Sequence, residues 1–168
     1  MSVDRDNGNG AFQPEILVLY CQSCVGRDVN LADSFRSLPG CKVRFLVMPC
    51  SSKIEVQQLV KLLEQGADGI QVVGCADTAC KFLVGSTRAE KRVVYVRDLL
   101  GEIDFGVERV AMVRGTDLSV GDLMEEAMGC AERVRALGPN PMRKGVEKHP
   151  AERLVRNAQM QGARNPEE

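Results

Sequence analysis

The sequence predicts an α/β protein with a doubly wound, flavodoxin-like parallel sheet of about four strands and flanking helices. Short runs of apolar residues recur along the chain, and such runs are typical of parallel strands covered on both faces. Segments with helical spacing of apolar residues alternate with these runs, as in doubly wound proteins. The 168 residues suffice for one domain with a substantial core and polar ends.

The first half of the chain supplies two of these strands. Residues 15–20 (EILVLY) form a continuous apolar run that ends at Cys21. Residues 42–50 (KVRFLVMPC) form the second run, which ends at Cys50. Between them we expect a helix over residues 28–38, with Leu31, Phe35 and Leu38 on one face and Gly40 just beyond its end.

A helix followed by the third strand comes next. Ser52 and Glu55 have the spacing of a capping box, and Gly66 suits the end of the helix. The apolar stripe between them consists of Val56, Leu59, Val60 and Leu63. Residues 69–75 (GIQVVGC) are the third strand, which also ends at a cysteine, Cys75.

The segment over residues 88–103 fits two readings. Its Val-Val-Tyr-Val stretch suits a strand. Thr87 and Glu90 have capping-box spacing, however, and apolar residues recur at helical spacing, so we predict a helix there. Residues 107–115 are then the fourth strand, and residues 120–137 an amphipathic helix closed by Gly138 and Pro139.

Three parts follow from this pattern. We expect a flexible lead over residues 1–13, an α/β domain over 14–138, and a polar tail over 139–168. The tail contains a candidate short helix at residues 150–161 and has no core of its own, which favours a docking arm for another protein.

Composition excludes several classes of function. The net charge is −1 without a dense basic block, and aromatic residues are few, so nothing indicates a nucleic-acid partner. The longest apolar runs have about six residues, against the roughly 20 that a membrane span needs. The first residues lack the plan of a signal peptide, so we expect a cytoplasmic location.

Cysteines mark the ends of the predicted strands. The chain has seven, and Cys21, Cys50 and Cys75 each end a strand. Cys24 and Cys80 follow three and five residues after Cys21 and Cys75, in turns that open the next segments. Because the carboxyl ends of parallel strands meet at one edge, where ligands bind in open α/β sheets, the five thiols should converge there.

Clustered thiols in a reducing compartment indicate metal or redox chemistry. Iron–sulfur clusters and structural zinc each take four thiolates. The dispersed C-x₂-C, C, C-x₄-C layout favours a cluster over zinc, which usually pairs two short knuckles. A thioredoxin-type pair needs only Cys21 and Cys24, and a flavin would find little room among the cysteines. Cys41 and Cys130 are expected in the core, and His149 at the surface.

These residues resemble the delta subunit family of methyl-viologen-reducing (F420-non-reducing) hydrogenase. The resemblance covers about residues 15–138. It depends on five features, which are CQSC, VMPCS, GADGIQVVGC, the C-x₄-C that ends at Cys80, and GSTRAEKR. Family members are small α/β proteins that carry a [2Fe–2S] cluster. They pass electrons between a hydrogenase or formate dehydrogenase and the flavin-containing A subunit of heterodisulfide reductase.

The resemblance implies a site and a role for this chain. It makes Cys21, Cys24, Cys50, Cys75 and Cys80 the candidate ligands, of which one [2Fe–2S] cluster needs four. It implies a subunit of an anaerobic redox complex with two partners. These are a heterodisulfide reductase A-like flavoprotein and a donor or acceptor oxidoreductase subunit.

The chain also departs from the family pattern around the cysteines. The family has a His-x-Gly-Asp-Cys-His-like run where this chain reads CADTACKF, and Gly-Arg is typical where Ser52 and Lys53 stand. Because surrounding hydrogen bonds and charges tune a cluster, these changes imply a paralogue with another potential and another parent complex.

Overall fold

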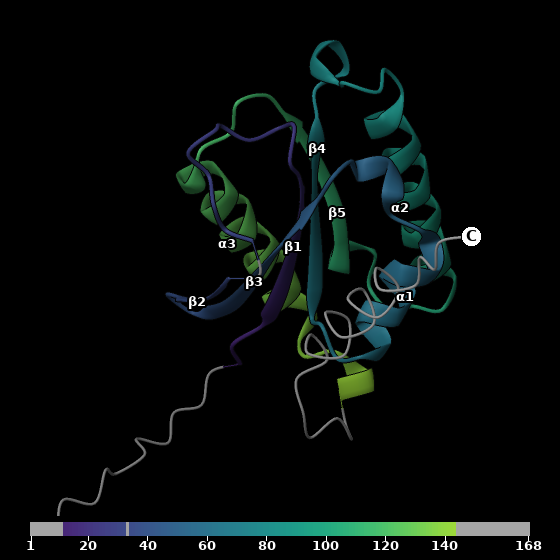
Figure 1. Cartoon of the computed structure of the whole chain (residues 1–168). Helices are drawn as coiled ribbons and strands as arrows, with labels where there is room; N and C mark the ends of the chain where they lie inside the picture. Colours follow the sequence, from purple (N-terminus) through teal and green to yellow (C-terminus); the bar gives the residue numbers. More distant parts are fainter. Residues whose placement is uncertain (1–11, 33, 144–168) are drawn as a thin grey trace, which may run out of the picture.

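The computed structural model describes residues 12–32 and 34–143, and in this part of the chain a single five-stranded sheet carries helices on both faces (Figure 1). The strands lie in the order β2-β3-β1-β4-β5. The predicted α/β class is therefore confirmed, with one more strand than expected.

Four of the strands are parallel and correspond to the four apolar runs. They are β1 (Glu15–Cys21), β3 (Cys41–Met48), β4 (Gly69–Cys75) and β5 (Val110–Gly115). β1 lies at the centre, where Tyr20 is opposite Val47 of β3 and Val73 of β4. β5 starts three residues later than expected, because Val107–Arg109 form a short 3₁₀ helix.

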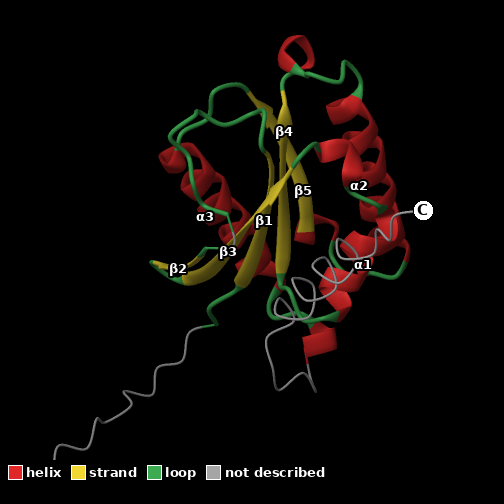
Figure 2. Cartoon of the chain, in the orientation of Figure 1, coloured by secondary structure: helices red, strands yellow, loops and turns green. Residues whose placement is uncertain are grey.

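Helices cover the two faces unequally, as Figure 2 shows. α3 (Val120–Leu137) packs on one face, and its buried side chains join the apolar residues of β1, β3 and β4 there. α1 (Val56–Glu64) and α2 (Gly85–Glu102) pack on the other face, over β4 and β5. Each face thus has its own apolar core, which explains why the strands are apolar on both sides.

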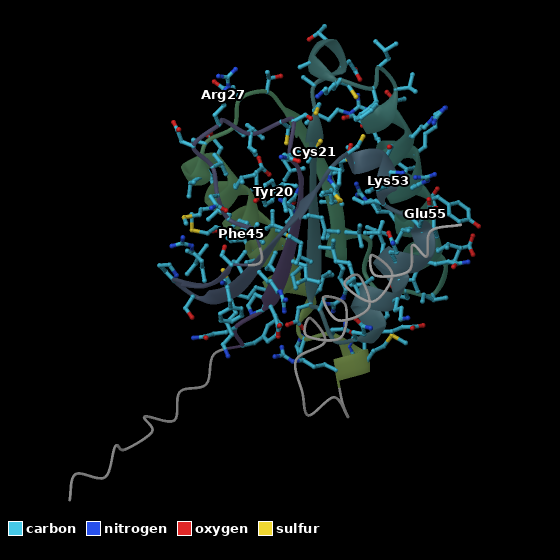
Figure 3. The ribbon with its side chains drawn as sticks, in the orientation of Figure 1. Tyr20, Cys21, Arg27, Phe45, Lys53 and Glu55 are labelled. Carbon is cyan, nitrogen blue, oxygen red and sulfur yellow. The ribbon has the colours of Figure 1, made fainter. Side chains whose placement is uncertain are left out.

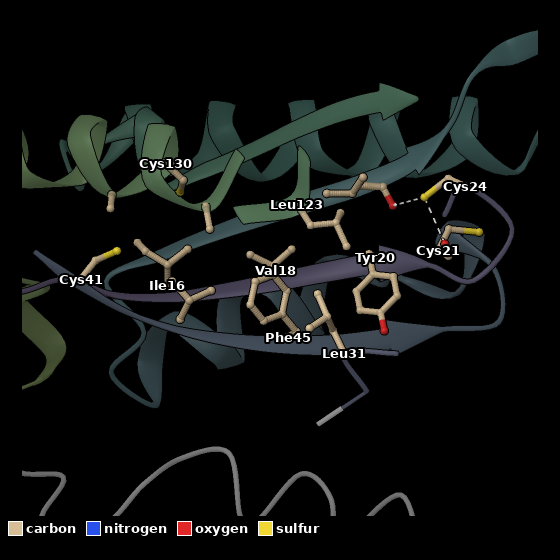
Figure 4. Close-up of a cluster of buried hydrophobic side chains, with 14 of the residues drawn as sticks. Ile16, Val18, Tyr20, Cys21, Cys24, Leu31, Cys41, Phe45, Leu123 and Cys130 are labelled. Carbon is tan, nitrogen blue, oxygen red and sulfur yellow. Dashed lines mark hydrogen bonds between the residues drawn. The ribbon is translucent and has the colours of Figure 1, made fainter. Parts of the chain in front are cut away.

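The helix expected over residues 28–38 is wrong. Residues 35–38 form β2 (Phe35–Leu38), an antiparallel edge strand paired with β3, and Phe35 is 49% exposed. Leu31 alone of the expected stripe is fully buried, next to Phe45 and Tyr20 in the core drawn in Figure 4. Pro39 and Gly40 make the hairpin turn, and Gly40 has a φ of 78°, which suits the third position of such a turn. The Pro-Gly pair was the signal for this hairpin.

The ambiguous segment is helical, as predicted, and α2 runs from Gly85 to Glu102. The two predicted capping boxes, at Ser52 and Thr87, are wrong. α1 begins after Glu55, whose N–H donates to the Gln58 side chain, and Ser52 lies in the 3₁₀ helix η1 (Ser51–Lys53). The N-cap of α2 is Val84, so Thr87 already lies inside the helix.

Residues 1–11 and 144–168 lie outside the described part, and with them most of the expected lead, the helix at 150–161 and His149. No helix in the described part of the chain is both long enough and apolar enough to cross a membrane.

Candidate metal centre

The five candidate thiols lie together at the carboxyl ends of β1, β3 and β4, here called the carboxyl edge. They belong to Cys21, Cys24, Cys50, Cys75 and Cys80. Cys21 and Cys75 are the last residues of β1 and β4, and Cys50 follows β3 by two residues. All five are free and buried. Figure 3 shows Cys21 near the top of the sheet, between the segments that carry Arg27 and Lys53.

Cys21 and Cys75 form a close pair within this group. Their Sγ atoms are 3.6 Å apart, joining neighbouring strands across the sheet. With metal–sulfur bonds of about 2.3 Å, two thiolates on one tetrahedral metal ion lie about 3.7 Å apart. The separation of the two sulfurs therefore suits a shared metal ion.

Cys50 and Cys80 meet at the start of α2. A β-carbon on Gly85 would lie 2.9 Å from Cys50 Sγ and 3.3 Å from Cys80 Sγ, so only glycine leaves room for both sulfurs there. Ser52 Oγ donates a hydrogen bond to Cys50 Sγ over 3.2 Å. Gly85 and Ser52 are thus part of the site, and no cysteine pattern could have identified them.

The helix start favours the thiolate form of Cys80. Burial alone would raise the pKa of this thiol, but the backbone N–H groups of Ser86, Phe82 and Gly85 lower it below its ordinary value. N–H groups at a helix N-terminus carry partial positive charge, which stabilises a thiolate. This part of the edge therefore favours the thiolate form that metal ligation requires.

The thiols nearer the core are held in the neutral form. Burial raises the pKa of Cys24 to about 11, and the neighbouring Cys21 adds to the shift. Burial, followed by the hydrogen bond and charge of Cys21, raises the pKa of Cys75 to about 12. Cys24 Sγ donates to the carbonyl oxygens of Cys21 (3.0 Å) and Val73 (3.8 Å), as drawn in Figure 4. A cation at this edge would remove the penalty, since metal binding deprotonates thiols.

Two arginines hold the loops that carry the thiols. Arg92 of α2 donates to the carbonyl oxygens of Ser52 (2.6 Å) and Ile54 (2.8 Å), and so fastens the segment after Cys50. Arg114 of β5 forms ion pairs with Asp77 and Glu90, which ties the loop between Cys75 and Cys80 to α2. Their role arises from contacts across the fold, so the sequence alone did not indicate it.

The described residues bring the five thiols together without arranging a finished ligand set. Among residues 12–32 and 34–143, no three cysteine, histidine or carboxylate side chains already surround one point as metal ligands. The donor set nevertheless suits a metal that prefers sulfur, because it consists of buried thiols with N–H and O–H groups beside them.

The two remaining cysteines lie elsewhere, as expected. Cys41 of β3 and Cys130 of α3 are buried in the core between α3 and the sheet, at the end of the sheet away from Cys21 and Cys24 (Figure 4).

Comparison with known proteins identifies relatives of the whole domain. The profile of the family described as "Methyl-viologen-reducing hydrogenase, delta subunit" matches residues 16–138. The vhu iron–sulfur subunit of F420-non-reducing hydrogenase from Methanococcus maripaludis is 29% identical over 131 residues, which cover 78% of this chain and 98% of that protein. The protein of the same name from Methanococcus voltae is 30% identical over 132 residues, with 79% and 98% covered.

A second group of relatives is much longer. A ferredoxin:CoB-CoM heterodisulfide reductase subunit of Methanosarcina mazei is 26% identical over 97 residues. These residues are 58% of this chain but only 12% of that protein. This chain therefore resembles one part of a larger heterodisulfide reductase subunit.

Proposed function

The chain belongs to the methyl-viologen-reducing hydrogenase delta subunit family, and on that premise we propose that it is an iron–sulfur electron-transfer subunit of a larger redox complex. The cluster is of the [2Fe–2S] type and is held by four of Cys21, Cys24, Cys50, Cys75 and Cys80. The observation that carries the proposal is the gathering of these buried thiols at one edge, with two sulfurs 3.6 Å apart.

The chemistry of the site supports iron and sulfide over zinc. A structural zinc completes a small fold, whereas this domain has an apolar core on each face of its sheet and does not need a metal to fold. The similar hydrogenase proteins are also named as iron–sulfur subunits. When bound, the cluster accepts and releases one electron at a time.

The residues of the chain have three tasks at this edge. The thiolates bind the cluster, and their burial keeps water away from it. Ser52 and the N–H groups beside Cys80 donate to the sulfurs and stabilise negative charge on them. Gly85 lets the sulfurs of Cys50 and Cys80 approach the helix start.

The partners follow from the relatives. One partner is a heterodisulfide reductase A-like flavoprotein, the other is a hydrogenase- or dehydrogenase-type subunit, and this chain relays electrons between them. The likeness to part of a heterodisulfide reductase supports the first, and the likeness to hydrogenase iron–sulfur subunits supports the second. Catalysis belongs to the partner subunits, in an anaerobic, cytoplasmic complex.

The same proposal covers the organisation of the chain. We take the fold as flavodoxin-like, which the order second-first-third-fourth of the four parallel strands supports. Residues 14–138 are the cluster domain. Residues 139–168 are a docking arm whose first residues, Asn140 and Arg143, are bonded to that domain.

Metal and sulfide analysis of protein purified without oxygen tests the proposal. We expect about two irons and two acid-labile sulfides per chain, and a [2Fe–2S] electron paramagnetic resonance signal after reduction with dithionite. Stoichiometric zinc without iron would assign the thiols to a structural zinc site. Metal-free protein whose activity in a thiol–disulfide exchange assay depends on Cys24 would assign them to an oxidoreductase.

A further inference from the structure

An exposed apolar tip lies directly beside the candidate metal centre. It consists of Phe82, Leu83 and Val84, which are 59%, 82% and 48% exposed. They form the longest run of exposed large apolar residues in the described part of the chain. The segment that carries them links β4 to α2 at the top of the molecule in Figure 1. Exposed apolar groups that cluster in this way mark interaction sites.

The backbone of the apolar tip is tied to Cys80. The Leu83 N–H donates to the Cys80 carbonyl oxygen over 2.9 Å, and the Phe82 N–H faces the Cys80 thiol. A partner that covers the tip would therefore be separated from a cluster ligand by little more than one turn of backbone. The five thiols are themselves buried, since each cysteine is 8% exposed or less.

Leu83 adopts a backbone conformation that leucine disfavours. Its φ is 58°, in the left-handed region, where asparagine and glycine are common and leucine is strained. Its side chain is also 82% exposed, the highest value among the large apolar residues of the described chain, so little burial offsets this strain. Strain kept at an exposed position beside a site indicates a role in binding.

Three cationic residues adjoin the apolar tip. Lys81 precedes it in sequence, and the backbone N–H of Arg88 donates to the Val84 carbonyl oxygen. Lys53 follows Ser52, whose β-carbon lies 3.7 Å from the place that a β-carbon on Gly85 would take. None of the three cations has an ion-pair partner among residues 12–32 and 34–143. The nearby carboxylates of Asp77, Glu90 and Glu55 are already paired with arginines. The rim of the tip is therefore positively charged.

We propose that the apolar tip docks into an apolar pocket with an acidic rim on the flavoprotein partner, and that Lys53, Lys81 and Arg88 align the two proteins. This inference rests on the proposed function, since it names where that partner binds. A protein pocket suits the tip better than a lipid surface, because the tip covers a ligand of a redox centre. Complementary charges around an apolar centre also set the orientation of two proteins.

Binding of the heterodisulfide reductase A-like flavoprotein to the full, cluster-loaded chain tests the proposal. Leu83→Asn keeps the left-handed backbone and removes the apolar side chain. We expect the dissociation constant to rise about tenfold or more, with an unchanged or higher melting temperature. The matched control is Ile103→Asn, the same kind of change at an exposed residue at the far end of α2, and it should leave binding unchanged.

Charge reversal tests the rim separately. Lys81→Glu should lower the association rate and weaken its dependence on salt, whereas Lys61→Glu on α1 should change neither. Iron and sulfide are measured on every sample, so that a failure of the proposed function appears as an absent cluster in the wild type.

Three results would overturn the docking site. One is Leu83→Asn protein that is loaded with cluster and binds the flavoprotein as tightly as the wild type. Another is an equal loss of binding in Leu83→Asn and Ile103→Asn. The third is wild-type protein that sediments with phosphatidylglycerol vesicles and does not bind the flavoprotein. This result would assign the tip to a membrane surface.

Discussion

Cys80 illustrates how the surroundings of one side chain select its chemistry. Cys80 and Cys75 belong to the same loop, yet N–H groups lower the pKa of Cys80, whereas burial and neighbouring thiols raise that of Cys75. Cys75 can join Cys80 as a ligand of one metal centre when the metal cation offsets the cost of deprotonating the buried Cys75 thiol.

Cys75→Ser should weaken iron binding at least about tenfold and so lower the iron content, since the loss of even a hydrogen bond to a ligand costs a metal site that much affinity. Cys75 Sγ lies 3.6 Å from Cys21 Sγ, so the serine removes one sulfur of this close pair. Cys130→Ala is the control, because Cys130 is buried in the core under α3. Equal iron in the two variants, measured after anaerobic purification, would remove Cys75 from the ligand set.

Ser52→Ala should lower the midpoint potential of the cluster while the iron content stays unchanged. The Ser52 hydroxyl donates to Cys50 Sγ, and a hydrogen bond to a ligand sulfur favours the reduced, more negative form. A redox titration followed by electron paramagnetic resonance measures the shift. Ser37→Ala on the edge strand β2 should not shift the potential, and a shift of the same size there would contradict the assignment.

Among the elements, the first turn of α2 serves the site most directly. It presents N–H groups to Cys80, and Gly85 makes space for two sulfurs. Arg92, two turns further on, fastens the loop after Cys50. The helix therefore organises the site without contributing a ligand.

Gly85→Ala should reduce cluster assembly although alanine favours helices. The added β-carbon would lie 2.9 Å from Cys50 Sγ and 3.3 Å from Cys80 Sγ, which forces the sulfurs apart. Gly121→Ala in the first turn of α3 is the matched control, since its nearest neighbour there would be Ser119 Oγ at 3.5 Å. Iron per chain and the melting temperature separate the two effects. Full iron content in Gly85→Ala would show that the space is not needed.

Over the whole molecule, the two ends of the sheet have different tasks. The carboxyl edge gathers the thiols, whereas the amino edge holds the end of the described chain. There Asn140 is buried and donates to the carbonyl oxygens of Leu63 and Ala67, and Arg143 pairs with Asp68. Arg109, which is 2% exposed, donates to four carbonyl oxygens, those of Phe105, Asp68, Gly138 and Pro139.

Arg109→Met should lower the free energy of unfolding by about 3 kcal/mol, because it leaves buried carbonyl groups without donors. Urea denaturation measures the loss. The control Arg135→Met removes an exposed arginine that donates to the Gly40 carbonyl oxygen, and it should cost less than about 1 kcal/mol. Iron content at low urea should be equal in both, since both arginines lie away from the thiols. Equal destabilisation would contradict the role of the buried arginine.

Prediction from the sequence succeeded where the local pattern of apolar residues matches the side chains that are buried in the fold. The four parallel strands, α1, α2 and α3 follow from apolar periodicity, and the convergence of five cysteines follows from where those strands end. The helix expected over 28–38 failed because apolar spacing cannot tell which side chain a distant strand will bury. Leu31 enters the core, while Phe35 pairs with Arg44 at the edge of the sheet.

The sequence by itself determined the α/β class, the edge to which the thiols come and the family to which the chain belongs. Only the tertiary structure decided that the sulfurs of Cys21 and Cys75 lie 3.6 Å apart, that Gly85 and Ser52 belong to the site, and that Phe82, Leu83 and Val84 are exposed beside it. The reason is physical. Apolar periodicity is a local pattern that marks where strands and helices form, whereas strand pairing and the spacing of sulfurs depend on contacts between residues tens of positions apart.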